Sequence, residues 1–516
     1  MKNLIRTKSL ILIFLGLIAG ILIFLSSPVL LSLGLAFFVI YYCRKNTIDA
    51  REKKFVTYAC AWAIIIRIVV SLGILIYGRY TGIGSDIFGD AMSYEGVGLY
   101  IKEIILGVPG KGILWGDNLI TVDWLRQVWK DTDRFGAVGT YTVPSVAYWY
   151  GYFNILWGDS FLATKILNGI LWVLGSFWLY TFFKDRFSAR GSRLGFLITL
   201  FLPSAILFSS SGLKDSLLFF LIVAAIFASH NLEKLKYNWF ISISIFFIPL
   251  AIIFLLKLDI LKLSFIITSL FILSLVMVLL KRGNFLFFSL MLCCAALLLS
   301  SLREYLYLFV LLSGFLIVFS RLLINKMFVI VIAALAVFIF GSGRIGSMNA
   351  LIKRITSESI AQSANTAVGN TAYYVYPERY YSDAGVGDSI TFLDFFVSYL
   401  NGLRYIFLEP VIWTFPNSVS LFMFPEMLLF YFLLPFIVLG VVFSMRLNLR
   451  IAAALALYLF LATSLLALGQ GNIGTLIRTR YMVMPFYFMI GSLGLYAAYS
   501  YIFKASNKPG QKGALS

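Results

Sequence analysis

The sequence predicts an all-α polytopic membrane protein with about 14 transmembrane helices and two large external loops that carry surface helices. The chain of 516 residues is 61% hydrophobic and has a mean hydropathy of +0.92. Soluble proteins average about 45–50% apolar residues. Apolar runs near the length that crosses about 30 Å of hydrocarbon recur from one end of the chain to the other. These runs, and the basic loops between them, predict the fold class.

The positive charge supports a membrane topology. The formal net charge is +19 at pH 7, and most of the basic residues lie in short segments between apolar runs. A nucleic-acid-binding protein would also be basic, but basic short loops are typical of the cytoplasmic side of a membrane protein. We therefore expect a lipid bilayer as a partner and no nucleic acid.

The apolar runs give the expected helices in order. The first two form a hairpin around Pro28, and each later run is bounded by polar or basic residues. Spans are expected at residues 9–25, 29–42, 55–77, 160–183, 194–210, 217–229, 239–256, 263–280, 285–300, 305–320, 327–341, 427–445, 451–468 and 481–503.

The same pattern divides the chain into parts. With both termini in the cytoplasm, the long polar segments fall on the outer face of a plasma (inner) membrane. The parts are an N-terminal hairpin with a basic loop (1–54), a transmembrane module (55–341) that includes the first external loop (78–158), a second external loop (342–426), C-terminal helices (427–503) and a cytoplasmic tail (504–516).

The external loops have the composition of ordered structure. The first is rich in Trp and Tyr, which favour the membrane interface. Residues 118–129 and 145–157 are expected to form helices along the membrane surface, and apolar residues recur at helical spacing over 393–407. Large outer loops with surface helices suit an enzyme that acts on a lipid-linked substrate better than a bare channel.

Cysteine and histidine usage limits the chemistry. The four cysteines lie in or beside apolar runs, so neither a structural disulfide nor a metal–thiolate site is expected. The one histidine, His230, ends an apolar run on the expected cytoplasmic side. A mechanism that uses an external histidine base is therefore excluded.

Three carboxylates fall within ten residues at the start of the first external loop: Asp86, Asp90 and Glu95. At the boundary between water and lipid, a carboxylate can accept the proton of a substrate hydroxyl. Glu95 is assigned a structural or supporting role, and Asp90 and Asp86 are the candidate bases.

Cations on the outer face form the second set of candidates. The charge bias does not explain them, whereas a lipid phosphate or pyrophosphate would; salt bridges to loop carboxylates are the alternative. Arg67, in the third expected span, needs a carboxylate or a polar cavity. The external candidates are Lys214 with Asp215 in a tight serine-rich turn, Arg303 with Tyr305, and Arg478 with Arg480 in the last loop.

These residues resemble a known family. The sequence Gly-Asp-Ala-x-x-Tyr at 89–94 looks like the first-loop acidic motif of the GT-C glycosyltransferases, polytopic enzymes that use polyprenyl-phosphate sugars. Residues 157–169 are similar to the segment that opens the next span, and Pro203 with the turn 209–215 fits the following part. The resemblance covers 55–229, and Ala91 stands where the family has a second acid.

The resemblance implies a reaction. Asp90, with Asp86 as second choice, would activate an acceptor hydroxyl of a glycan, lipid or protein, and this oxygen would attack the sugar of a polyprenyl-phosphate donor with inversion. Tyr94 and the external cations would bind substrate, with Lys214, Arg303, Arg478 and Arg480 on the leaving phosphate. No cofactor is specified; no dedicated metal ligands occur, and a divalent metal ion is left open.

Two other functions fit the same pattern. A polymerase that joins lipid-linked repeat units would also have many spans, large outer loops and external arginines. A transporter of lipid-linked glycans would have similar halves or interrupted helices near the midplane. We find no internal repeat in the sequence, and the candidate residues cluster on one face.

Overall fold

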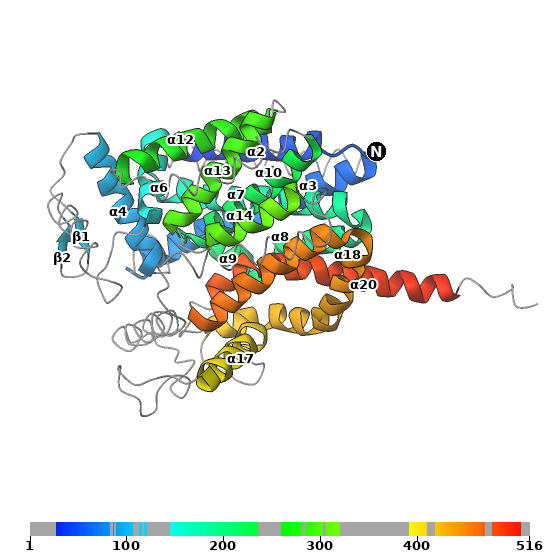
Figure 1. The fold of residues 1–516 in the computed structure, drawn as a ribbon. Coiled ribbons are helices and arrows are strands. Elements are labelled where there is room, and N and C mark those ends of the chain that lie inside the picture. Colours follow the sequence, from blue (N-terminus) through cyan, green and yellow to red (C-terminus); the bar gives the residue numbers. More distant parts are fainter. Residues whose placement is uncertain are drawn as a thin grey trace, which may run out of the picture. The chain divides into compact units, whose positions relative to one another are not determined.

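The computed structural model shows a helical protein. It describes residues 27–82, 86, 89–106, 113–115, 118–120, 145–235, 260–280, 284–302, 306–319, 392–409, 418–469 and 477–506. Within these residues, one short pair of strands interrupts the helical structure (Figure 1). The expected spans at 9–25, 239–256 and 327–341 lie outside the described residues.

The chain folds as two compact units. The first unit comprises Met1–Asp131, Thr142–Leu174 and Ile206–Phe220. The second unit comprises Thr132–Tyr141, Gly175–Ala205 and Leu221–Ser516.

The first unit begins with the helix pair α2 (Ser27–Lys45) and α3 (Ala50–Tyr80), which pack against each other. Asp49 caps α3, because its carboxylate accepts a hydrogen bond of 3.0 Å from the backbone N–H of Arg51. The expected basic loop 43–54 is therefore shortened to a four-residue connection, 46–49.

The start of the expected first external loop is helical. Helices α4 (Gly89–Ile105) and α6 (Ser145–Trp157) pack side by side (Figure 1). Gly151 makes this approach possible, since a Cβ there would lie 2.8 Å from Ile101. The expectation of a helix at 145–157 is confirmed, and α6 buries Tyr150, which is only 1% exposed.

The other helix expected in this loop, at 118–129, is described only over 118–120 and is wrong there; residues 121–129 lie outside the described residues. Residues 118–120 belong to strand β2 (Asn118–Ile120), which pairs antiparallel with β1 (Ile113–Trp115), and not to a surface helix. The Gly-Asp sequence between the two strands is a typical hairpin turn. This turn signal outweighed the helical spacing of the apolar residues that follow it.

Two long helices have parts in both units: α7 (Phe161–Arg186) and α10 (Asp215–Leu235). Between them, the expected span 194–210 is broken into α8 (Ala189–Phe201) and α9 (Pro203–Ser209), which meet at an angle of 53°. Pro203 explains the break, because a proline disfavours helical geometry at the preceding residue. Leu202 is accordingly extended, with ψ 132°.

The second unit contains the remaining helices. Its longest element, α18, is two helices that meet at Asn448, where φ −155° and ψ 83° interrupt the helix. This break agrees with the expected division into spans 427–445 and 451–468. Besides α8 and parts of α7, α9 and α10, the described elements of this unit are α12 (Ile260–Leu279), α13 (Phe285–Leu302), α14 (Leu306–Val318), α17 (Phe392–Leu408), α18 (Ser418–Gly469), η1 (Arg480–Met482) and α20 (Met484–Ser506).

Glycines bring α18 and α20 into close contact (Figure 1). A Cβ at Gly494 would lie 1.9 Å from the carbonyl oxygen of Phe436, and one at Gly440 would lie 1.9 Å from that of Ile490. The two backbones therefore touch directly, as in membrane helix pairs with small residues at their interface.

The membrane character of the chain is supported by its helices. Among the described residues, five helices are long and apolar enough to cross a membrane, or six if α8 and α9 form one bent span. The five segments are Ser27–Lys45, Ala50–Tyr80, Phe161–Arg186, Asp215–Leu235 and Phe424–Ala467.

Candidate functional site

The first unit contains a buried group of charges that we call the acid centre: Asp86, Glu95 and Lys165. The Lys165 Nζ lies 2.9 Å from Asp86 Oδ2 and 2.6 Å from Glu95 Oε1. All three side chains are at most 2% exposed. Lys165 comes from the second turn of α7, Glu95 from α4, and Asp86 from the segment just before α4.

The acid centre combines two carboxylates with one ammonium group. Removing such charges from water costs several kcal/mol per ion, and close pairing with further hydrogen bonds offsets that cost. The Gly212 N–H supplies one such bond, donating to Asp86 Oδ2 at 2.9 Å. The three side chains together carry a net charge of about −1 when all are ionised.

A hydrogen-bond network connects the acid centre to the turn between α9 and α10. The Asn168 Nδ2 donates to the Tyr150 hydroxyl at 3.1 Å and to the carbonyls of Ser211 and Leu213 at 2.9 and 3.3 Å. The Tyr150 hydroxyl donates to the Gly212 carbonyl at 2.6 Å. Burial, with a smaller contribution from the nearby carboxylates, raises the Tyr150 pKa well above its ordinary value. The hydroxyl therefore keeps its proton as a donor.

The turn also requires glycine at position 212. A Cβ there would lie 2.5 Å from Glu95 Oε1 and 3.2 Å from the Cβ of Ala91. Glu95 is held by Lys165 and has little freedom to move away. The absence of a side chain at Gly212 thus lets the turn lie directly on the acid centre.

Arg67 approaches the same turn from α3. Its Nε donates to the Ser209 hydroxyl at 2.7 Å, and its Nη1 donates to the Ala63 carbonyl at 3.0 Å. One helical turn further, the Ser71 hydroxyl donates to the Ser210 carbonyl at 3.0 Å. Arg67 is 1% exposed. Of the two surroundings expected for Arg67, a carboxylate or a polar cavity, no carboxylate lies within ion-pair distance in the described part of the chain.

Several predicted site residues come together in the first unit. The Lys214 ammonium lies 5.9 Å from the centre of the Tyr94 ring, within range for a cation–π interaction. Asp215 begins α10 and is 2% exposed. Asp90 lies in the first turn of α4, one turn before Tyr94, and its side chain is outside the described residues.

The other predicted residues are not among the described residues of the first unit. Arg303 and Tyr305 are outside the described residues, and Arg478 and Arg480 belong to the second unit. Arg480 does not project from an open loop as expected: it is 1% exposed. Its Nη1 donates to the Glu409 carbonyl at 2.6 Å and to the Ile406 carbonyl at 3.4 Å.

These carbonyls explain the position of Arg480. Both lie at the C-terminal end of α17, where carbonyl groups have no partner within the helix. Burial lowers the pKa of the guanidinium, and the charge of Glu426 opposes this shift. The Tyr481 hydroxyl donates to both Glu426 oxygens, at 2.7 and 2.9 Å. Arg480 is therefore a helix-capping group in this structure.

A further ion cluster in the second unit joins the ends of α7 and α10. We call it the helix-end cluster: Asp185, Arg186, His230, Glu233 and Lys234. Arg186 pairs with Glu233 and donates to His230 Nδ1 at 2.8 Å, while the Lys234 Nζ lies 2.6 Å from Asp185 Oδ2. Its two carboxylates and two cations balance.

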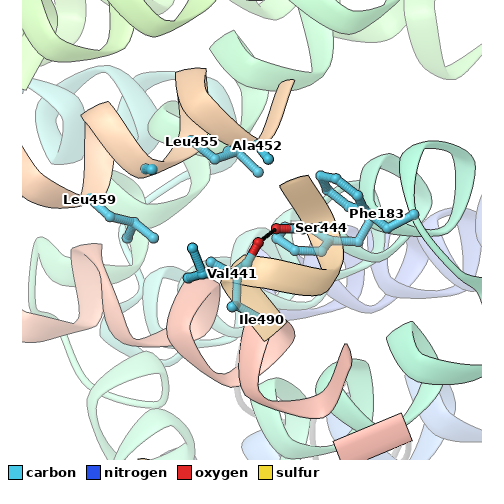
Figure 2. Close-up of a pocket in the computed structure, with 9 residues that line it drawn as sticks. Phe183, Val441, Ser444, Ala452, Leu455, Leu459 and Ile490 are labelled. Atoms are coloured by element: carbon cyan, nitrogen blue, oxygen red, sulfur yellow. Dashed lines mark hydrogen bonds between the residues drawn. The ribbon is translucent and has the colours of Figure 1, made fainter. Parts of the chain in front are cut away.

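The second unit has a small hollow around the break of α18, which Figure 2 shows. Its lining is apolar apart from Ser444, whose hydroxyl donates to the Val441 carbonyl at 2.8 Å. Phe183 and Ile490 lie on other sides of the same hollow. Because the Ser444 hydroxyl already donates a hydrogen bond, this hollow offers no chemistry comparable to that of the acid centre.

Sequence reasoning missed several residues of the acid centre and its network. Lys165 and Asn168 interrupt an apolar run three residues apart, a spacing that places both on one face of a helix. Polar residues within a span are costly, so this pair was a usable signal. Tyr150 carried no such signal, because it is one of many aromatic residues in its loop.

Among the described residues, no group of three or more His, Cys, Asp or Glu side chains is close enough to hold a metal ion. The Lys165 ammonium occupies the place between Asp86 and Glu95.

Comparisons with protein-family models, with curated proteins and with solved structures give no match to the chain.

Proposed function

We propose that this protein is a membrane glycosyltransferase that moves a sugar from a polyprenyl-phosphate donor to an acceptor on the outer face of a plasma membrane. Such a reaction would serve cell-surface glycan or exopolysaccharide assembly. The observation that carries the proposal is the acid centre. Buried charges in a membrane protein are costly and mark substrate sites by default.

The acid centre supports the first turn of α4, which carries Asp90. Asp86 Oδ2 already accepts bonds from Lys165 and Gly212, so we assign Asp86 and Glu95 to positioning. Asp90 is the proposed base. It takes the proton of the acceptor hydroxyl as that oxygen bonds to the anomeric carbon of the sugar.

The bond between the anomeric carbon and the phosphate oxygen breaks in the same step, and polyprenyl phosphate leaves with the electron pair. Its negative charge requires a positive group nearby. Lys214, in the turn that lies on the acid centre, is the described cation best placed beside Tyr94. Arg303, with Tyr305, and Arg478 remain proposed contributors.

The exposed side of α3 supports a membrane location. Tyr58 and Trp62 near one end are 65% and 55% exposed, and Tyr77 and Tyr80 near the other are 55% and 90% exposed. Along an ideal helix, Tyr58 and Tyr77 are about 28 Å apart, close to the hydrocarbon thickness of a bilayer. Aromatic side chains favour both interfaces. About 14 spans, external long loops and cytoplasmic termini belong to this proposal.

The test compares cells lacking the gene with cells that carry the wild-type chain, Asp90→Asn or Asp159→Asn. Asp159 is the matched control, since it is 55% exposed and pairs with Lys102 at the surface. We expect Asp90→Asn to lower transfer by about 10²–10⁴-fold, the usual contribution of a general base. Lipid extracts analysed by mass spectrometry should then contain accumulated polyprenyl-phosphate sugar, as in the deletion strain.

The Asp159→Asn chain should restore the wild-type lipid profile. If the Asp90→Asn chain transferred the sugar as well as the wild type does, Asp90 could not be the base. Accumulation of complete repeat units on polyprenyl diphosphate would indicate the polymerase instead. An unchanged lipid profile in the deletion strain would contradict the proposed function.

One observation favours a second candidate, a transporter of lipid-linked glycans. The break between α8 and α9, with its angle of 53°, is of the kind that forms substrate sites in transporters. A transporter would leave the lipid-linked sugar on the cytoplasmic leaflet of the deletion strain. There it would be protected from periodate, an oxidant that does not cross the membrane, whereas a stalled transferase donor on the outer leaflet would be oxidised.

A further inference from the structure

Arg67 is a buried cation that the proposed transfer does not yet use. It lies near the middle of α3, one of the helices long and apolar enough to cross a membrane. Its described contacts are a serine hydroxyl and a backbone carbonyl, and both are neutral. A guanidinium group in apolar surroundings is costly unless a negative charge compensates it.

Arg67 differs in this respect from Lys165, a second cation buried deep among the described residues of the first unit. Lys165 has carboxylate oxygens at 2.6 and 2.9 Å. The Arg67 Nη2 is buried and makes no hydrogen bond with any residue that the structure describes. The arginine thus has a donor and a charge available, and its Nε already contacts the serine-rich turn at Ser209.

The turn provides a second donor of the same kind. The Ser210 hydroxyl is buried and makes no hydrogen bond within the described part of the chain. It is adjacent to Ser209, which binds the Arg67 Nε, and the Ser71 hydroxyl holds the Ser210 carbonyl. Two donors without a hydrogen bond, one of them charged, therefore belong to residues that α3 and the turn bring together through the Arg67–Ser209 and Ser71–Ser210 contacts.

We infer that Arg67 and Ser210, with Ser209 holding the guanidinium in place, form a binding site for a phosphate group. Arginine presents a planar fork of donors that matches phosphate oxygens, and serine hydroxyls complete such sites. If the protein is the proposed glycosyltransferase, on which this identification rests, the phosphate is that of the lipid-linked donor. Because Arg67 is 1% exposed, binding requires the turn 209–214 to move.

A methionine substitution separates this site from a structural arginine. Arg67→Met leaves no described partner unbonded, because Ser209 also donates to the Ile206 carbonyl and the Ala63 carbonyl lies within α3. Removing an uncompensated buried charge should leave the Tm of the ligand-free protein equal to or above that of the wild type. An arginine paired with a carboxylate would give the opposite result, a lower Tm.

The binding experiment uses the full chain in detergent or nanodiscs, with farnesyl phosphate, farnesol and inorganic phosphate as probes. We expect farnesyl phosphate to raise the Tm of the wild type, and Arg67→Met to weaken its apparent affinity by about tenfold or more, the loss of one charged hydrogen bond. Ser210→Ala should weaken it by about two- to fivefold without lowering the Tm. Arg79→Met, a change on the exposed side of α3, is the matched control and should bind as the wild type does.

The probes distinguish the source of the phosphate. Stabilisation by farnesyl phosphate alone identifies a lipid-linked phosphate, and stabilisation by inorganic phosphate identifies a soluble one; either supports the site if it depends on Arg67. A lower Tm of ligand-free Arg67→Met, or equal binding of farnesyl phosphate by Arg67→Met and the wild type, overturns it. Arg67-dependent binding without any glycosyl transfer would retain the site and remove the proposed function, so the two failures are distinct.

Discussion

The acid centre and the helix-end cluster use similar charges near the two ends of α7, but in different surroundings. The acid centre buries two carboxylates and one ammonium group at 0–2% exposure. In the helix-end cluster, Lys234 is 47% and Asp185 is 26% exposed, and the charges balance. Water can therefore compensate a lost partner of Lys234 or Asp185, but not one of the acid centre; Arg186 and Glu233, at 13% and 2% exposure, lie between these cases.

This contrast indicates different purposes. A half-exposed, balanced cluster joins two helix ends at little cost and adds little stability. A buried, unbalanced one is expensive to build, and the close contacts among Asp86, Lys165 and Gly212 show that the fold is arranged to hold it. The variants that follow test this difference, beginning with the largest expected effect.

Lys165→Met should be the most damaging change. It leaves Asp86 and Glu95 buried without their ammonium partner, and breaking a buried ion pair lowers the free energy of unfolding by about 3–5 kcal/mol. Denaturation of the detergent-solubilised chain, followed by circular dichroism, measures the loss. The control is Lys102→Met, since Lys102 forms the exposed pair with Asp159 and should cost at most about 1 kcal/mol. If both variants lost the same free energy of unfolding, the buried ion pairs of the acid centre would be no more important for stability than the exposed pair.

Gly212→Ala tests the close approach of the turn to the acid centre. The new Cβ would collide with the Glu95 carboxylate, and such overpacking typically costs about 1–3 kcal/mol. Gly73→Ala on α3 is the matched control, because nothing lies within 4 Å of a Cβ there. It should be neutral or stabilise by up to about 1 kcal/mol. If the two alanine variants unfold at the same denaturant concentration, the turn does not lie on Glu95 as described.

Arg186→Met tests the better-buried half of the helix-end cluster. Arg186 is 13% exposed and its partner Glu233 is 2% exposed, so we expect a loss of about 1–2 kcal/mol, between the buried and exposed cases. Arg190→Met, at an exposed position in the first turn of α8, should change the unfolding free energy by less than about 0.5 kcal/mol. A loss as large as that of Lys165→Met would contradict the contrast between the two clusters.

Lys234→Ala should have the smallest effect. The side chain is 47% exposed and pairs with a partly exposed Asp185, so its removal should cost about 0–1 kcal/mol. Salt screens such pairs, and the difference from the wild type should shrink further at 1 M salt. Thermal unfolding at low and high salt measures both, and a salt-independent loss above 1 kcal/mol would require a buried role for Lys234.

Local sequence patterns predicted most helices of the described part well. The expected span 160–183 corresponds to α7 (Phe161–Arg186), and the expected span 55–77 lies within α3 (Ala50–Tyr80). Long apolar runs leave few alternatives to a helix. The errors arose at turn and proline signals: β2 replaced a helix at 118–120, and Pro203 divided one expected span into two.

The candidate site was predicted only in outline. The acidic stretch and the turn with Lys214 were identified, and the structure brings Tyr94 and Lys214 together. The supporting role expected for Glu95 agrees with its contact to Lys165, but the burial of Asp86 could not be predicted, because Asp86 looked like a loop residue open to water. Arg480 was expected to bind a lipid phosphate, but the end of α17 lies against it.

Composition and apolar periodicity were sufficient for the helical, membrane-type character of this protein and for the order of its helices, since each depends on neighbouring residues. They were not sufficient for the partners of the buried charges, because those partners depend on which helices meet. Lys165 and Glu95 are 70 residues apart in the chain and 2.6 Å apart in space. Arg67, one turn of α3 from Ser71, received no carboxylate at all among the described residues. Tertiary contacts thus give Lys165 its carboxylate partners and leave Arg67 without an anion among the described residues.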